Sequence, residues 1–73
     1  MISADEALHI ADQAAQRENW GRITSEFHAV VGSQNGSATW EVRRKYPVIG
    51  SDFWFRIDAE TGAILDKGKR GPR

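Results

Sequence analysis

The chain contains two histidines, and these are its most obvious candidates for metal or acid–base chemistry. His9 follows Asp5 by four residues and precedes Asp12 by three, so the three side chains share one helix face, as metal ligands can. A stable site needs a further ligand and supporting hydrogen bonds, and the chain has no cysteine to contribute. The helical pattern places His9 in the middle of the polar face. We therefore expect a surface histidine, with no metal or other cofactor.

His28 has Glu26 two residues away on the same side of an extended segment, an arrangement that a general base can use. The pattern around it supplies no nucleophile or oxyanion hole. The glycine-containing segment 32–36 precedes a strand pattern, so it lacks the helix N-terminus that binds phosphate. A chain of 73 residues with one helix and one sheet also has little concave volume for a substrate. These features predict a protein that is not an enzyme.

The N-terminal segment predicts one amphipathic helix. Ser3-Ala4-Asp5-Glu6 matches a capping box, in which the Ser3 hydroxyl and the Glu6 carboxylate accept from each other's backbone amides. At about 100° per residue, the apolar side chains fall in one arc; they are Ala4, Ala7, Leu8, Ile10, Ala11, Ala14 and Ala15. The apolar pattern predicts that the helix ends near residues 17–19. Because its stripe is mostly alanine, the large core side chains must come from the rest of the chain.

Four further segments have the composition and alternation of strands, and they cover residues 23–31, 39–46, 52–58 and 63–66. In the second of these, Trp40, Val42 and Tyr46 share one side. Residues 32–37 are expected to form a turn around Asn35-Gly36, a strong hairpin signal. Short connections favour an antiparallel meander. The predicted fold is α+β, with one N-terminal amphipathic helix packed on a four-stranded antiparallel meander sheet, in a single domain over residues 1–66.

Charge is unevenly distributed along the chain. Residues 1–42 hold six acids against two arginines, and residues 43–73 hold eight bases against four acids. Half of those bases lie in the glycine- and proline-containing segment 67–73, which is expected to be a flexible basic C-terminal tail. Nucleic-acid binding requires a basic stripe on a folded face, so it is not predicted. A membrane span is not predicted either, because no apolar run approaches about 20 residues.

Period-two alternation divides the segment Asp52–Asp58 between two faces. If Phe53, Phe55 and Ile57 point toward the helix, Trp54 and Arg56 point away from it. A single helix can cover only one face, so the other face is expected to carry Trp54, Arg56, Arg43, Glu41, Glu26 and His28. A slip of one residue in strand register would exchange the two faces.

Tryptophan and arginine are enriched in binding hot spots. The sequence therefore predicts a partner-binding surface made of Trp54, Arg56, Arg43, Glu41 and His28. In the alternative interpretation, Trp54 packs along the aliphatic stems of the two arginines and meets no partner.

The segment Asp58-Ala59-Glu60-Thr61-Gly62 predicts a tight turn. Asp58 can accept from backbone amides two or three residues further on, and Gly62 can adopt positive φ. We interpret Asp58, Thr61 and Gly62 as structural residues of this turn.

The chain resembles PepSY domains over residues 2–66. The segment Ser3–Ala11 is similar to their opening helix, Thr39–Val42 to a middle strand, and Phe55–Leu65 to their closing hairpin. The resemblance implies a small α+β module that occurs in propeptides of thermolysin-type metallopeptidases and regulates or inhibits peptidases, with no catalytic residues to carry over. It also favours an extracytoplasmic location, although the acidic start Met1–Glu6 does not match a signal peptide.

Two alternatives remain open. His28-Ala29-Val30-Val31-Gly32 is similar to the inhibitory hairpin loop of cystatins, with histidine in place of their glutamine. A structural domain could instead bury its open sheet face against a second copy. The expected function is a non-catalytic module of PepSY type that binds a protein or peptide, with a peptidase as one such partner, and that is a monomer or weak dimer.

Overall fold

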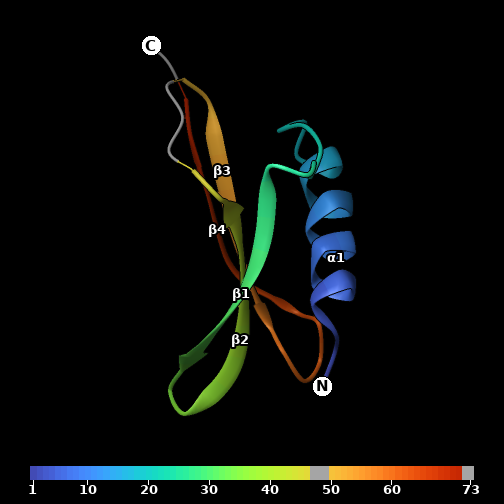
Figure 1. The fold of residues 1–73 in the computed structure, drawn as a ribbon, viewed down its shortest axis with the longest axis vertical. Coiled ribbons are helices and arrows are strands. Elements are labelled where there is room, and N and C mark those ends of the chain that lie inside the picture. The colour runs from blue at the N-terminus through green and yellow to red at the C-terminus, as the bar shows by residue number, and fades with distance from the viewer. Residues whose placement is uncertain (47–49, 72–73) are drawn as a thin grey trace.

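The computed structural model describes residues 1–46 and 50–71. A helix, α1 (Ala4–Arg17), is followed by four strands, β1 (Phe27–Gln34), β2 (Ser37–Arg44), β3 (Asp52–Asp58) and β4 (Ile64–Arg70). The strands form one antiparallel sheet in the order β1-β2-β3-β4, and α1 lies along one face of it (Figure 1). The predicted α+β meander is confirmed. No helix in the described ranges has the length and apolarity needed to cross a membrane.

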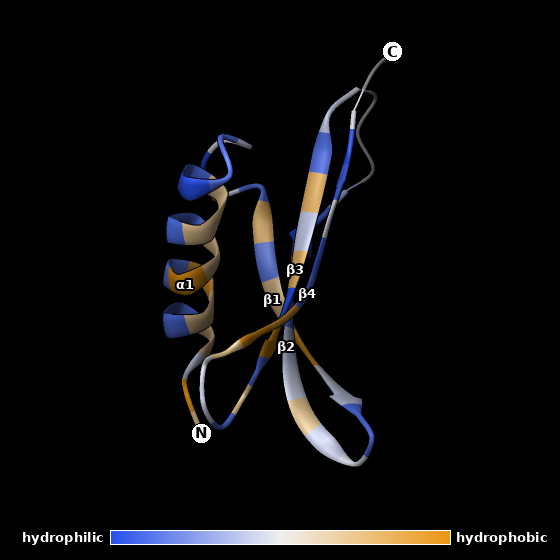
Figure 2. Cartoon of the chain, turned by 180° about the vertical axis from the view of Figure 1, so that it is seen from behind, coloured by the Kyte–Doolittle hydropathy of each residue, from blue (hydrophilic) through white to orange (hydrophobic). Residues whose placement is uncertain are grey.

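Four alanines of the α1 stripe are buried in the core, as predicted. The capping box at Ser3 and Glu6 is present, and the helix ends at Arg17. Figure 2 shows the helix standing beside the strands. The buried core combines small helix residues with large strand residues; they are Ala7, Ala11, Ala14, Ala15, Phe27, Val42, Phe53, Phe55 and Ile57. Because alanine brings the helix close to the sheet, aromatic rings can fill the layer between them.

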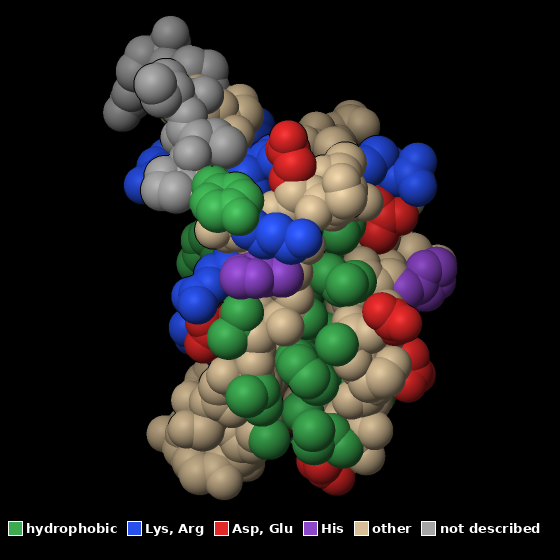
Figure 3. All heavy atoms as spheres, viewed as in Figure 1, with side chains coloured by type: hydrophobic (Ala, Val, Ile, Leu, Met, Phe, Trp, Pro, Cys, Tyr) green, Lys and Arg blue, Asp and Glu red, His purple; other side chains and the backbone are tan. Residues whose placement is uncertain are grey.

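Apolar side chains also remain partly accessible at the edge of this core. Figure 3 shows hydrophobic groups gathered along the seam between α1 and β1. Leu8 of α1 and Ala29 of β1 are half-buried and pack against the core cluster. Trp20, just after the helix, packs against the core, and its ring centroid lies 5.6 Å from that of Phe55.

Both ends of the helix are tied to neighbouring segments. At the start, the Ile2 amide donates to the Ala59 carbonyl at 2.7 Å, and Trp40 Nε1 donates to the Ile2 carbonyl at 3.0 Å. Toward the end, Asp12 Oδ1 accepts from the Ile23 amide at 2.8 Å and from Arg22 Nε at 3.0 Å. The Arg22 hydrogen bond, and then the Ile23 amide, hold the pKa of Asp12 below its usual range.

The first hairpin differs from the sequence expectation in its extent. β1 begins at Phe27, four residues later than predicted, and continues to Gln34. Pairing from Gly32 with Thr39 onward reduces the predicted turn 32–37 to Asn35 and Gly36, with φ of +53° and +83°. The expectation that Tyr46 shares one side of a strand with Trp40 and Val42 is wrong, because β2 ends at Arg44 and Tyr46 is 76% exposed whereas Val42 is buried.

The predicted flexible tail is wrong for residues 67–70. These residues extend β4, with Phe53 opposite Lys69 and Trp54 opposite Gly68. Lys67 also forms an ion pair with Glu18 beyond the end of α1. Backbone pairing does not depend on apolar side chains, so a basic segment continues the strand wherever β3 offers a free edge. Residues 72–73 of the predicted tail lie outside the described residues.

Candidate partner-binding surface

The strand register decides which side chains share the helix-free face. Glu41 of β2 lies opposite Arg56 of β3, and Arg43 lies opposite His28 of β1. Trp54 is two residues from Arg56 on the same strand and therefore points to the same face. The structure thus places the five residues of the predicted surface on one face.

Glu26, which the sequence also assigned to this face, lies elsewhere. It precedes β1, and its carboxylate accepts from Arg44 Nη1 at 2.8 Å. The Glu26 carboxylate is therefore bound to Arg44, and the described residues show no hydrogen bond or ion pair between it and His28. His9 is exposed on the polar side of α1, as predicted. Within the described residues, no group of three or more potential ligands is placed to hold a metal ion.

Trp54 is the largest accessible apolar side chain of this face, with 39% of its surface exposed. A Cβ built on Gly68, its cross-strand partner, would lie 2.6 Å from indole atoms, so the ring lies against the Gly68 backbone. The Arg56 guanidinium carbon is 5.9 Å from the ring centroid, within cation–π range. The indole is therefore supported from two sides and remains partly open to solvent.

Ion pairs organise the charges around the tryptophan. Glu41 accepts from Arg43 Nη1 at 3.4 Å and lies 3.8 Å from Arg56 Nε. Arg56 also lies 3.9 Å from Asp66 of β4. Pairs this exposed contribute only about 0–1 kcal/mol each to stability. Their main effect is to orient the arginines along the face.

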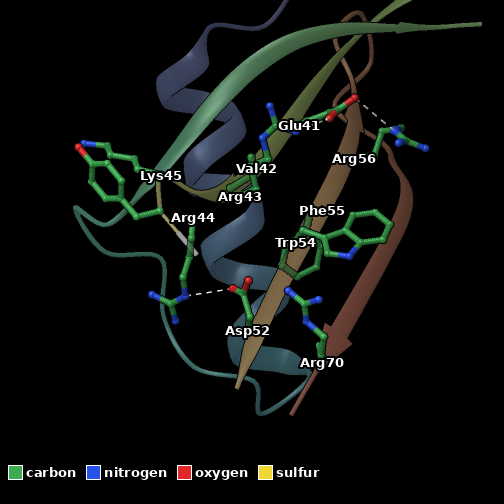
Figure 4. A pocket seen from close by; sticks show the side chains of 11 residues that line it. Glu41, Val42, Arg43, Arg44, Lys45, Asp52, Trp54, Phe55, Arg56 and Arg70 are labelled. Atoms are coloured by element: carbon green, nitrogen blue, oxygen red, sulfur yellow. Dashed lines mark hydrogen bonds and ion pairs between the residues drawn. The ribbon is translucent and has the colours of Figure 1, made fainter. Parts of the chain in front are cut away.

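A hollow of about 450 Å³ opens beside Trp54, on the face opposite α1 (Figure 4). It lies where β2 and β3 stop pairing with each other, after the pair Val42–Phe55. Beyond this pair, β2 remains paired only with β1, and the first residues of β3, from Asp52, pair only with β4. The side chains that line it come from both diverging strands and from the end of β4; they are Glu41, Val42, Arg43, Arg44, Lys45, Tyr46, Asp52, Trp54, Phe55, Arg56 and Arg70.

An ion pair bridges the two strands at this point. Arg44 Nε lies 3.0 Å from Asp52 Oδ1, which also accepts from the Phe53 amide at 2.8 Å. The Arg44 guanidinium carbon lies 4.5 Å from the Phe27 ring centroid. Sequence reasoning missed Arg44 and Asp52, as well as Arg70, because local patterns do not reveal where two strands separate.

The turn between β3 and β4 has the hydrogen bonds of a tight structural turn. Asp58 Oδ1 accepts from the Glu60 and Thr61 amides at 2.7 and 3.1 Å, and Thr61 Oγ1 accepts from the Ala63 amide at 3.2 Å. Gly62 has a φ of +80°. A Cβ at Gly62 would lie 3.1 Å from Ile10 Cδ1, so the turn is packed against α1.

This architecture is that of a small α+β domain in which a helix covers one sheet face, and the other face presents an aromatic side chain among ion-paired charges beside a hollow. A family model described as "Peptidase propeptide and YPEB domain" (PepSY) matches residues 1–67. The chain belongs to the PepSY family, which is associated with peptidase propeptides and with the regulation of peptidases. No curated protein and no solved structure gave a match.

The cystatin-like interpretation is not favoured. Val31 and Gly32, which would have to lie at a hairpin tip, are inside β1 and pair with Trp40 and Thr39. The tip itself is Asn35-Gly36. The hairpin therefore does not present the segment that resembles the inhibitory loop.

Proposed function

We propose that this PepSY domain is a non-catalytic module that binds a protein or peptide through its helix-free sheet face, and that its partner is a peptidase which it regulates. The contact residues are Trp54, Arg56, Arg43, Glu41 and His28. The observation that carries the proposal is the partly exposed indole of Trp54, held between Gly68 and Arg56 on the face that α1 leaves uncovered.

Support for the contact residues comes from the way the side chain is held. An indole that already rests on a backbone and a guanidinium loses little rotamer freedom when a partner covers it. Arginines ordered by Glu41 can offer their remaining donors to carboxylates of the partner. Truncation of a hot-spot side chain of this kind typically costs about 2 kcal/mol or more of binding free energy.

The family supports a peptidase as the partner, because its description refers to peptidase propeptides. A domain of propeptide type would act by binding the peptidase, and binding requires a stable surface but no catalytic residues. We place this action outside the cytoplasm, the location that the family resemblance favours.

The test uses binding to, and inhibition of, a thermolysin-type metallopeptidase. We expect the wild-type domain to bind and Trp54→Ala to bind about thirtyfold more weakly, the equivalent of about 2 kcal/mol. Val31→Ala is the matched control, because Val31 is 59% exposed but belongs to the opposite face of the sheet. Thermal unfolding of both variants is measured in parallel.

Two results would contradict the proposal. If Trp54→Ala binds as tightly as the wild type, the indole is not part of the contact. If Trp54→Ala unfolds the domain, its packing on Gly68 and Arg56 is structural, and the alternative interpretation without a partner is favoured.

A further inference from the structure

The hollow between the diverging ends of β2 and β3 combines a positive lining with an aromatic wall. Its cations are Arg43, Arg44, Lys45, Arg56 and Arg70, and its acids are Glu41 and Asp52. Two further carboxylates, Glu26 and Asp66, pair with Arg44 and Arg56 from outside the lining, so five cations face four carboxylates and a small excess of positive charge remains. The partner that this lining favours therefore carries negative charge.

Ion pairs within the lining leave two of its cations without a carboxylate partner. Arg44 is paired with Asp52, and Glu41 is shared by Arg43 and Arg56. Lys45 and Arg70 form no ion pair with any residue in the described ranges. Lys45, which directly follows β2, and Arg70, at the end of β4, can donate to carboxylates of a ligand without breaking an existing pair.

Trp54 adds an apolar contact next to these cations. Figure 4 shows Arg70 extending from β4 toward Trp54 and Asp52. The same three residues line a smaller hollow of about 270 Å³ together with Gly68 and Lys69. A ligand that reaches Arg70 thus also meets the indole, so the site suits a chain that carries both carboxylates and apolar side chains.

The strand edges favour a peptide over a nucleic acid. In the hollow, Arg43 and Arg44 pair only with β1, and residues 52–54 pair only with β4, so the facing backbone edges are not paired with each other. An extended peptide can approach such edges with its own amides and carbonyls. Glu41 and Asp52 interrupt the basic lining and occupy its arginines, so the hollow offers no continuous row of unpaired cations for a phosphate backbone.

We propose that this hollow binds an acidic segment of the partner protein in extended conformation. Its carboxylates meet Arg70 and Lys45, and an apolar side chain lies against Trp54. This inference rests on the proposed function, because it names the chemistry of the partner that the helix-free face recognises.

The experiment is a titration of the whole domain, followed by amide NMR shifts, with an acetylated and amidated octapeptide in which glutamate alternates with leucine and serine. Control peptides carry glutamine or lysine in place of each glutamate. We expect shifts at Arg44, Trp54 and Arg70, and binding at least about tenfold weaker for the glutamine peptide. Raising the salt from about 50 to about 300 mM is expected to weaken binding of the acidic peptide.

A pair of variants locates the charge contact. Arg70→Gln is expected to bind the acidic peptide at least about tenfold more weakly, with unchanged thermal unfolding. Arg17→Gln removes an equal charge from the exposed end of α1, away from the hollow, and is expected to bind like the wild type. Equal weakening by the two variants would show that only net charge matters, and it would overturn the site.

The remaining outcomes separate this inference from the proposed function. Equal binding of the glutamate and glutamine peptides, or tighter binding of a single-stranded oligonucleotide of equal charge, would overturn it. If no peptide binds while the metallopeptidase still distinguishes wild type from Trp54→Ala, the inference fails and the proposed function stands. If the acidic peptide binds at the hollow but the metallopeptidase does not bind, the peptide site stands and the peptidase partner is wrong.

Discussion

Gly62 shows how one residue links a local turn to the core. Its φ of +80° allows the chain to reverse after Asp58, and its missing side chain leaves room for Ile10 of α1. The positive φ could be predicted from the turn sequence, because aspartate and glycine at this spacing have few other ways to close it. The contact with Ile10 could not, since it joins residues more than fifty positions apart.

Gly62→Val is therefore expected to lower the free energy of unfolding by more than about 1 kcal/mol. A β-branched side chain is strained at positive φ, and its Cβ would lie 3.1 Å from Ile10 Cδ1. Gly36→Ala is the comparison, because Gly36 also has positive φ but nothing lies within 4 Å of its added Cβ. Chemical denaturation measures both, and an unchanged midpoint for Gly62→Val would contradict the packed turn.

At the scale of elements, α1 is joined to the segment before β1 by a single carboxylate. Helical periodicity predicts that Asp12 lies on the polar face, as it does, yet the side chain is only 16% exposed and accepts from Ile23 and Arg22. Those partners follow the end of the helix, so no helical spacing would have identified them. The segment after Arg17 thus turns back along α1 before it continues into β1.

This arrangement makes stability depend on pH in acid. Because the Arg22 hydrogen bond and the Ile23 amide lower the pKa of Asp12 from 3.8, ionised Asp12 stabilises the folded state above that value. The contribution is lost as the pH falls through the lowered pKa of the folded state. We expect the stability difference between wild type and Asp12→Asn to be constant above about pH 5 and to shrink below pH 3.8.

Denaturation curves recorded from about pH 7 to about pH 2.5 measure this difference. Arg22→Gln provides the control, because it removes the largest cause of the lowered pKa and should flatten the dependence. A difference that grows as the pH falls would mean that the carboxylate is destabilising, which contradicts the hydrogen bonds described above.

At the scale of the whole molecule, the sheet consists of two hairpins that pair along only part of their length. β1 with β2 and β3 with β4 form long ladders, whereas β2 and β3 pair only from Thr39–Asp58 to Val42–Phe55. Beyond that point, Arg44 and Asp52 hold the hairpins together. The hollow beside Trp54 is a consequence of this partial pairing.

Asp52→Ala is expected to lower the free energy of unfolding by about 1–3 kcal/mol. The Arg44 and Asp52 side chains are only 19% and 20% exposed, and the substitution leaves both the guanidinium and the Phe53 amide without this acceptor. Asp66→Ala removes a carboxylate that is 56% exposed and 3.9 Å from Arg56, so it should cost at most about 0.5 kcal/mol. Equal losses for the two variants in urea denaturation would rule out a special role for the Arg44–Asp52 pair.

The sequence by itself determined the features that depend on neighbouring residues: the capped helix with its alanine stripe, the Asn35-Gly36 hairpin, the Asp58–Gly62 turn and the alternation that separates Trp54 from Phe53 and Phe55. Helical period, strand period and turn chemistry are local, so they can be read along the chain. The likeness to PepSY domains follows from the same segments.

Only the tertiary structure decided where β4 ends, which carboxylate joins α1 to the next segment, and where β2 separates from β3. Each depends on which distant segments face each other, and backbone pairing places few demands on side-chain type. The basic residues up to Arg70 therefore look like a tail in sequence, yet they form a strand because the edge of β3 is there to pair with them.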